Sequence, residues 1–232
     1  MREPVAAFFT ILYAPLMLIL FGSIYGNEPT PLFGGRGMVD VSVPAYMGLI
    51  IVTVGLMSVP IQTASSREAG VLRRYQATPL RPMAYLIANV AGNYGMALLG
   101  ILLLLLVGKV GYNVQFDGNV PSVLGGGTLG TLAFFALGYL VASLAPTARI
   151  AQTVGMVLAF PMMFLSGATI PLETMPESVR NVSRFIPLTH VVTLLQGLWF
   201  GEGWGEHLTE IIVLVGTLGI GTAVAARLFR WE

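Results

Sequence analysis

Six apolar runs divide this chain, and each has about the length that an α-helix needs to cross a lipid bilayer, roughly 17–25 residues. Backbone inside lipid must satisfy its own hydrogen bonds, so such runs form helices there. Only 10% of the residues are charged and 55% are hydrophobic, whereas a soluble domain carries about 25% charged residues. The sequence therefore predicts an all-α membrane protein with six transmembrane helices, at about residues 5–25, 43–64, 83–107, 122–144, 150–165 and 208–226.

Segment 65–82 lies between the second and third runs and sets a single acid, Glu68, against several arginines. A surplus of Arg beside an apolar span marks the cytoplasmic side of a membrane. With six spans, placing this segment inside places both chain ends inside as well. We therefore expect a multi-pass plasma-membrane protein with cytoplasmic termini. The basic residues on the expected inner side are Arg2, Arg67, Arg73, Arg74, Arg81, Arg149, Arg227 and Arg230.

The same segment has features of a short cytoplasmic helix. The Ser pair at 65–66 can cap a helix N-terminus, and Pro79 and Pro82 would stop the helix before the next span. Glu68 and Gly70 are followed by Leu72-Arg73-Arg74 and then by Ala77-Thr78-Pro79. This order of residues resembles the coupling loop of type-2 ABC exporter permeases. The other interpretation is an ordinary solvated loop whose arginines only set the topology. On the resemblance, contact with an ATPase falls to Arg67, Glu68, Gly70, Leu72, Arg73, Arg74, Thr78 and Pro79.

Region 166–207 is a long and partly apolar connection on the expected outer side. Its middle, 176–185, has the pattern of a short helix. The apolar stretch after Pro187 is too short to span, so it indicates a re-entrant or interfacial helix, with Trp199 and Trp204 at headgroup depth. The region is similar to the signature region of the same permease family, although its prolines could equally shape a plain outer loop. The residues that carry this similarity are Ser166, Ala168, Met175, Pro176, Pro187, Leu188, His190 and Gln196.

The resemblance implies one transmembrane permease domain over 1–232, with a cytoplasmic coupling helix and two short re-entrant or interfacial helices before the last span. It implies a separate cytoplasmic ABC ATPase subunit that binds ATP and Mg, and a second permease copy or close relative. No cofactor is expected in this chain itself. Family members usually begin with an amphipathic cytoplasmic helix. Here the first span follows Met1 almost directly, so either the chain is abbreviated or its start is assigned late.

Catalytic, metal and nucleic-acid functions lack sequence support. The chain has no cysteine, no HExxH and no GxSxG motif, and no basic run beyond the membrane flanks. The glycines at 125–127 lack the Lys-Ser/Thr of a phosphate loop. A cluster near the start of the last span has helical spacing that could hold a cation, but it is more typical of a solvated helix face. That cluster is Glu202, Glu206, His207 and Glu210.

Three polar side chains in apolar surroundings remain open to two interpretations each. Asn89 and Asn93 are four residues apart and so share one face of the third helix. They either line a substrate path or form interhelical hydrogen bonds. His190 either senses protons or contacts substrate, or it holds the turn after Pro187 by a hydrogen bond.

The sequence favours the membrane subunit of an ATP-driven exporter whose cargo is amphipathic, drug-like or lipid-like, because its spans are rich in Leu, Met and Phe. Two alternatives remain. One is a membrane scaffold or receptor subunit that docks an ATPase without transporting anything. The other is an exporter of a lipid-linked glycan.

Overall fold

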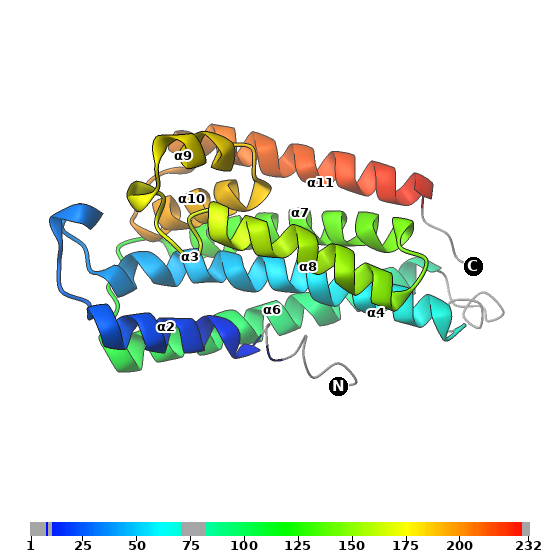
Figure 1. Cartoon of the computed structure of the whole chain (residues 1–232), viewed down its shortest axis with the longest axis horizontal. Coiled ribbons are helices and arrows are strands. Elements are labelled where there is room, and N and C mark those ends of the chain that lie inside the picture. The colour runs from blue at the N-terminus through cyan, green and yellow to red at the C-terminus, as the bar shows by residue number, and fades with distance from the viewer. Residues whose placement is uncertain (1–7, 9–10, 71–81, 229–232) are drawn as a thin grey trace.

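A computed structural model describes residues 8, 11–70 and 82–228, and the regular elements among them are helices. The longer helices run side by side along one axis (Figure 1). Five helical stretches are long and apolar enough to cross a membrane. The helices are α2 (Tyr13–Tyr25), α3 (Met38–Thr53), α4 (Val59–Glu68), α6 (Pro82–Tyr112), α7 (Val120–Leu144), α8 (Ala148–Leu165), α9 (Glu177–Ser183), α10 (Pro187–Trp199) and α11 (Leu208–Leu228).

The expected second to sixth spans each coincide with a long helical stretch. The expected first span corresponds to α2, which has 13 residues in the described part of the chain and is too short to count among the five. Residues 5–7, 9 and 10 of that expected span lie outside the described residues. The all-helical prediction is confirmed, whereas the count of six spans stays a prediction.

The core of the bundle is one helical rod from Met38 to Glu68, formed by α3, a π-helical turn at Val54–Ser58 (η2) and α4. Its sequence is apolar nearly all round, as expected for a helix covered on every side. In its most apolar window 94% of the residues are buried. The π turn lies in the middle of this buried stretch, where α7 and α8 contact the rod.

Glycines bring α7 and α8 into backbone contact with the π turn. A Cβ atom on Gly55 would stand 2.6 Å from the Cβ of Phe134 on α7. Gly138 on α7 faces the carbonyl oxygen of Gly55, and Gly155 on α8 faces that of Leu56. Small residues at such positions let membrane helices approach closely. The rod, α7 and α8 are therefore held together at their middles.

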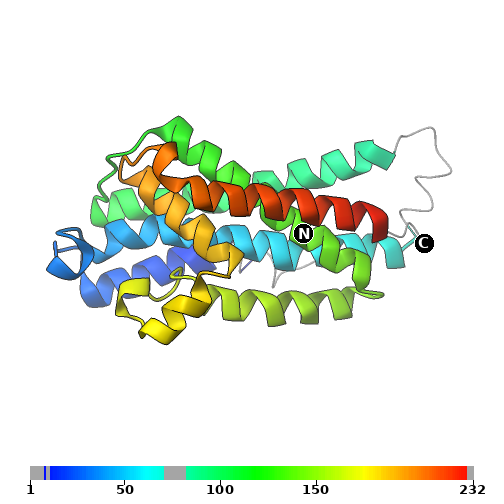
Figure 2. The same cartoon turned by 90° about the horizontal axis from the view of Figure 1, so that it is seen from above.

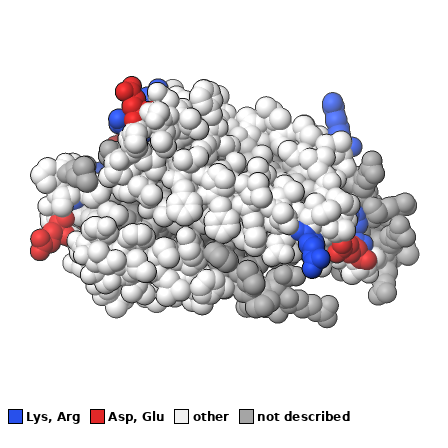
Figure 3. Space-filling view, in the orientation of Figure 1, with Lys and Arg blue, Asp and Glu red and all other residues white. Residues whose placement is uncertain are grey.

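The other long helices present wide apolar faces. Only 28%, 22% and 17% of the most apolar windows of α6, α8 and α11 are buried. Figure 2 shows α8 at one edge of the bundle. On the visible side of the molecule, Lys, Arg, Asp and Glu gather at the two ends and leave an uncharged band between them (Figure 3). An apolar band between charged ends is the surface that a bilayer-spanning protein needs.

The bundle has two ends, called the Glu68 end and the Asn27 end after one residue at each. The Glu68 end carries the last turn of α4 and the α7–α8 turn at 145–147, and the Asn27 end carries the loops at 26–37 and 113–119. The prediction that the Ser pair at 65–66 starts a new helix is wrong, because both serines lie in α4. The helix continues through both serines to Glu68. The N–H of Ala69 then donates a hydrogen bond to the carbonyl oxygen of Ser65 at 3.0 Å.

The two short helices predicted in region 166–207 are present as α9 and α10. Nine residues of the 13-residue α10 are buried, and this helix contacts α3, α7 and α11. Gly126 and Gly130 of α7 make room for it, since they face Leu198 and Val191. Trp199, expected at headgroup depth, is 5% exposed and donates its indole N–H to the carbonyl of Gln115 at 3.0 Å. Thus α10 is inserted among the long helices rather than laid on their surface.

Candidate functional site

Arg67 ties the Glu68 end together. From the last turn of α4 its guanidinium donates hydrogen bonds to the carbonyl oxygens of Ala142, at 3.2 Å, and Ala145. Both carbonyls belong to the C-terminal end of α7, where the last carbonyls of a helix lack partners within the helix. A cation is also favourable there because of the helix dipole. Arg67 therefore fastens α4 to the turn that leads into α8.

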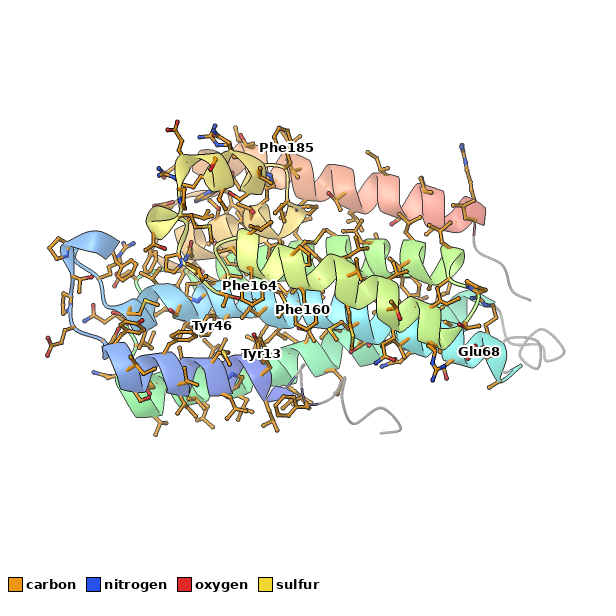
Figure 4. All side chains as sticks on the ribbon, viewed as in Figure 1. Tyr13, Tyr46, Glu68, Phe160, Phe164 and Phe185 are labelled. Carbon is orange, nitrogen blue, oxygen red and sulfur yellow. The ribbon has the colours of Figure 1, made fainter. Side chains whose placement is uncertain are left out.

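Glu68 follows Arg67 but points away from the bundle. Its side chain is exposed at the tip of α4 (Figure 4). Gly70 then takes φ +65°, a left-handed conformation that suits glycine, and ends the helix. Of the predicted coupling residues, Arg67, Glu68 and Gly70 are therefore described. Leu72, Arg73, Arg74, Ala77, Thr78 and Pro79 lie outside the described residues.

A polar cluster joins three helices in the half of the bundle nearer Glu68. Asn93 on α6 is 3% exposed, and its Nδ2 donates to the Oε1 of Gln62 on α4 at 3.1 Å. The same Nδ2 lies 2.9 Å from the carbonyl oxygen of Asn89 and 3.2 Å from its Oδ1. Tyr139 on α7 donates to that Oδ1 at 2.9 Å. The expected common face of Asn89 and Asn93 is thus used for interhelical hydrogen bonds.

One polar atom of this cluster is left over. The Oδ1 of Asn93 is buried and has no hydrogen-bond partner among the described residues. A buried acceptor in that condition costs about 1–3 kcal/mol. Asn93 therefore retains the capacity to accept one hydrogen bond from a group that enters the cluster.

An apolar cavity of about 390 Å³ begins at the same place. Tyr139 belongs both to its wall and to the polar cluster. The cavity lies between α6, α7 and α11, and its size falls in the usual range for small-molecule sites, about 300–1,000 Å³. The apolar wall is formed by Leu86, Val90, Leu132, Phe135, Leu218 and Ala225, among others.

The predicted signature residues occupy turns and caps. Ser166 is fully buried and its Oγ accepts the N–H of Ala168 at 3.2 Å. Met175 ends a short 3-10 turn, while Pro176 and Pro187 stand at the starts of α9 and α10. These residues therefore shape the path of the chain before the last long helix.

Two side chains tie α10 into the fold. His190 Nε2 lies 2.9 Å from the carbonyl oxygen of Arg184, the contact expected of a residue that holds the turn after Pro187. Gln196 donates from Nε2 to the carbonyl of Val41 on α3 at 3.2 Å. The hydrogen-bonding interpretation of His190 thus agrees with the structure.

Around His207, Glu202 and Glu206 are exposed, as on a solvated face, and Glu210 is partly exposed. His207 is 6% exposed and lies against Gly197 of α10. Its Nε2 is 2.9 Å from Glu202, and its Nδ1 is 3.8 Å from Glu210. In the described part of the chain, no group of three or more His, Cys, Asp and Glu residues is placed to hold a metal ion. The cluster braces α10 against the start of α11.

Sequence reasoning missed a second polar network, at the Asn27 end. Asp40, 6% exposed in the first turn of α3, accepts hydrogen bonds from Asn27 and from the backbone N–H of Gln115. Asn27 also lies within 3.5 Å of the carbonyl oxygen of Tyr112. The only available signal was an acid just before an apolar run, in a Gly-rich loop. This network joins the loops 26–37 and 113–119 to α3.

The comparisons with known proteins agree with one another. Residues 25–227 match the model of a family described as ABC-2 family transporter protein. The chain is 24% identical over 196 residues to the inner membrane transport permease YhhJ of Escherichia coli, covering 81% of this chain and 52% of that one. It is 25% identical over 194 residues to the probable multidrug ABC transporter permease YbhR of the same organism, covering 81% and 51%. It is also 25% identical over 195 residues to ABC transporter G family member 20 of Dictyostelium discoideum, covering 82% and 25%.

Proposed function

The chain belongs to the ABC-2 family of transporter proteins, and we propose that it is the transmembrane subunit of an ATP-driven exporter of an amphipathic, drug-like or lipid-like molecule. The chain spans about half the length of the E. coli relatives it matches. The resemblance of segment 65–82 to a coupling loop and the name of YbhR as a probable multidrug permease both support this assignment.

The observation that carries the proposal is the attachment of Arg67 to α7. The described beginning of segment 65–82 is the last turn of α4, and Arg67 fixes this turn to the carbonyls of Ala142 and Ala145. A partner that pulls on this segment therefore acts on α4, α7 and the start of α8 together. Exposed Glu68 is available for charge contact with such a partner. The proposed partner is a cytoplasmic ABC ATPase, a separate chain that binds ATP and Mg.

The cavity between α6, α7 and α11 supports the proposed cargo class. Its wall is almost entirely apolar, and Tyr139 of that wall also donates a hydrogen bond to Asn89 of the polar cluster. Such a site offers burial for an apolar body and hydrogen bonds for one polar group. An amphipathic cargo meets both requirements, whereas a free sugar would leave most of its hydroxyl groups without partners.

A second permease copy is proposed on the outer face of α8. Phe160 and Phe164 are 39% and 48% exposed there and lie one turn apart (Figure 4). In contrast, the strongly exposed large apolar residues of α6 and α11 are aliphatic, as at Leu102, Ile212 and Ile220. Aromatic side chains are enriched at protein interfaces. We therefore expect α8 to face the partner permease and the other two helices to face lipid.

The function is tested by separating transport from folding. Glu68→Ala and Arg73→Ala are each reconstituted with the ATPase, and transport into vesicles is compared with wild type. Loss of a hydrogen-bonded charge contact costs about 2–5 kcal/mol, so we expect reduced transport and reduced recovery of the ATPase on co-purification. Glu177→Ala is the matched control, an exposed acid on α9, far from α4 (Figure 1).

The outcomes distinguish the alternatives. ATPase binding without movement of any cargo class would favour a scaffold or receptor subunit. Movement of a lipid-linked glycan, rather than a drug-like or lipid-like cargo, would replace the proposed cargo. Wild-type coupling in both variants would make segment 65–82 an ordinary loop that sets topology.

The assembly is tested by cysteine cross-linking, which has no background because the sequence lacks cysteine. Val157→Cys on α8 and Ile220→Cys on α11 are 66% and 70% exposed in the single chain. We expect a disulfide-linked dimer from Val157→Cys alone. Dimers from Ile220→Cys alone would place the second copy on the other side of the bundle, and monomer in both would contradict a two-fold assembly.

A further inference from the structure

A second apolar groove, of about 400 Å³, lies near the Asn27 end between α3, α6 and α7. Its walls include Val43, Met47, Ile101 and Leu105. Lys109 is the one charged residue that lines it, and it is also the only lysine in the sequence. This groove shares no lining residue with the cavity proposed for cargo.

Lys109 stands where α6 leaves the apolar region. It is the only charged residue of α6 and lies in the last turn of that helix, two residues after the apolar stretch 99–107. An α-helix of 31 residues is about 46 Å long, well beyond the hydrocarbon thickness of about 30 Å. The end of α6 therefore has room to reach the headgroup layer, and a lysine near it extends its ammonium into that layer.

Two aromatic side chains line the same end of the groove. Phe116 packs edge-on against Trp199, with ring centroids 4.7 Å apart, and both line the groove. The indole N–H of Trp199 is already bonded to the carbonyl of Gln115. This end of the groove therefore combines aromatic rings with a cation, while its remaining walls are aliphatic. Of the two rings, that of Phe116 is the exposed one, at 37%, and an exposed aromatic ring near a basic residue is typical of the membrane interface.

The charge of Lys109 is not neutralised within the described part of the chain. Lys109 is exposed and takes part in neither of the ion pairs found there, both of which belong to His207. Asp40 is buried and committed to Asn27 and Gln115. The ammonium group of Lys109 is therefore available to an anion from outside the chain.

We propose that this groove binds an anionic phospholipid, with an acyl chain along the aliphatic walls and the phosphodiester against Lys109. The apolar groove and the unpaired cation at its interfacial end match the two parts of such a lipid. A zwitterionic lipid fits the groove equally well but carries a headgroup cation that repels Lys109. This site is independent of the proposed export function, since it uses neither segment 65–82 nor the cargo cavity.

The test measures lipid retention by native mass spectrometry of the purified full chain. The protein is taken from nanodiscs that contain equal amounts of phosphatidylglycerol and phosphatidylcholine with identical acyl chains. We expect wild type to retain phosphatidylglycerol preferentially. A basic residue near a membrane surface strengthens the binding of anionic lipid about fivefold. Lys109→Gln should therefore lower the preference for phosphatidylglycerol about fivefold, whereas Lys109→Arg should keep it.

Three controls separate this site from a general effect of charge, from retention outside the groove and from binding of the headgroup alone. Arg149→Gln removes an exposed cation at the Glu68 end and should leave the preference unchanged. Leu124→Trp fills the groove from a position that is 49% exposed, and should reduce retention of both lipids. Inorganic phosphate and glycerophosphate should not raise the midpoint temperature of thermal unfolding of the wild-type protein. Equal retention of both lipids by wild type, an unchanged preference in Lys109→Gln, unchanged retention in Leu124→Trp, or stabilisation by phosphate alone would each overturn the proposal.

Discussion

Asn27 and Asp40 exchange two hydrogen bonds, each 3.1 Å long: the Nδ2 of Asn27 donates to the carboxylate of Asp40, and the backbone N–H of Asp40 donates to the Oδ1 of Asn27. That Oδ1 also accepts the N–H of Val39 at 3.1 Å. Asn27 thus satisfies the first turn of α3 from a position outside the helix, and Asp40 sits where the helix dipole favours an anion.

Replacing Asn27 by Ala should therefore destabilise the protein. The change leaves two helical N–H groups and a largely buried carboxylate without these partners, and we expect a loss of about 1–3 kcal/mol. The measurement is the unfolding free energy in detergent. Asn119→Ala is the matched control, because Asn119 precedes α7 without a side-chain capping bond. Equal stability of the two variants would show that Asn27 does not hold the start of α3.

Arg67 and Glu68 are neighbours, but we expect only the substitution of Arg67 to lower the stability of the protein clearly. Arg67→Ala should lower the unfolding free energy by about 1–3 kcal/mol, because hydrogen bonds to α7 carbonyls are lost. Lysine cannot reproduce the forked contact, so Arg67→Lys should fall in between. Glu68→Ala should stay within about 0.5 kcal/mol, as exposed substitutions usually do. Arg149→Ala is the control for an exposed arginine. A stable Arg67→Ala protein would contradict the fastening of α4 to α7.

The contact between the π turn and α7 is tested at Gly55. An added methyl group would stand 2.6–2.9 Å from side-chain and backbone atoms of Phe134. Overpacking of this kind costs about 1–3 kcal/mol, and we expect Gly55→Ala to lower the thermal midpoint. Gly219 on α11 has no atom within 4 Å of an added Cβ. Gly219→Ala should therefore be neutral or stabilising by up to about 1 kcal/mol. Similar losses in both variants would point to a general demand for glycine.

Asn93 allows the two interpretations of the polar cluster to be separated. Asn93→Leu removes a hydrogen bond between helices, worth about 0.6 kcal/mol on average, and also removes the acceptor that has no partner. We expect the unfolding free energy to change by less than about 1 kcal/mol while transport falls.

The control for Asn93 is Thr131→Val, which removes a buried hydroxyl that bonds only within α7. It should leave transport intact. Normal transport together with a clear loss of stability in Asn93→Leu would assign the cluster to helix packing alone.

Much of the fold follows from the length and composition of the apolar runs. The expected spans at 122–144 and 150–165 end at the last residues of α7 and α8. Pro187 was expected to start a new helix and stands in the first turn of α10. These features are local, because they depend on apolar length and on the missing N–H of proline.

Long-range contacts could not be predicted in the same way. Asn27 and Tyr112 are far apart in sequence, and nothing in either residue indicates the other. Similarly, only the packed structure shows that Gly126 and Gly130 face α10 whereas Gly219 faces no other helix. The three glycines occur in similar small-residue patterns in the sequence. A small-residue pattern therefore does not show which glycines are used for close packing.

The π turn at Val54–Ser58 also changes the direction in which side chains of the central rod point on its two sides. A π turn holds one residue more than an α turn, and one residue corresponds to about 100° of rotation in an α-helix. Side chains after Val59 are therefore turned by roughly that angle from where the pattern set by Tyr46 and Ile50 would place them. Deleting one residue from this turn would leave the rod straight and helical yet out of phase, aiming Arg67 away from the end of α7. The extra residue of the π turn therefore sets the direction in which Arg67 and the rest of the Glu68 end face.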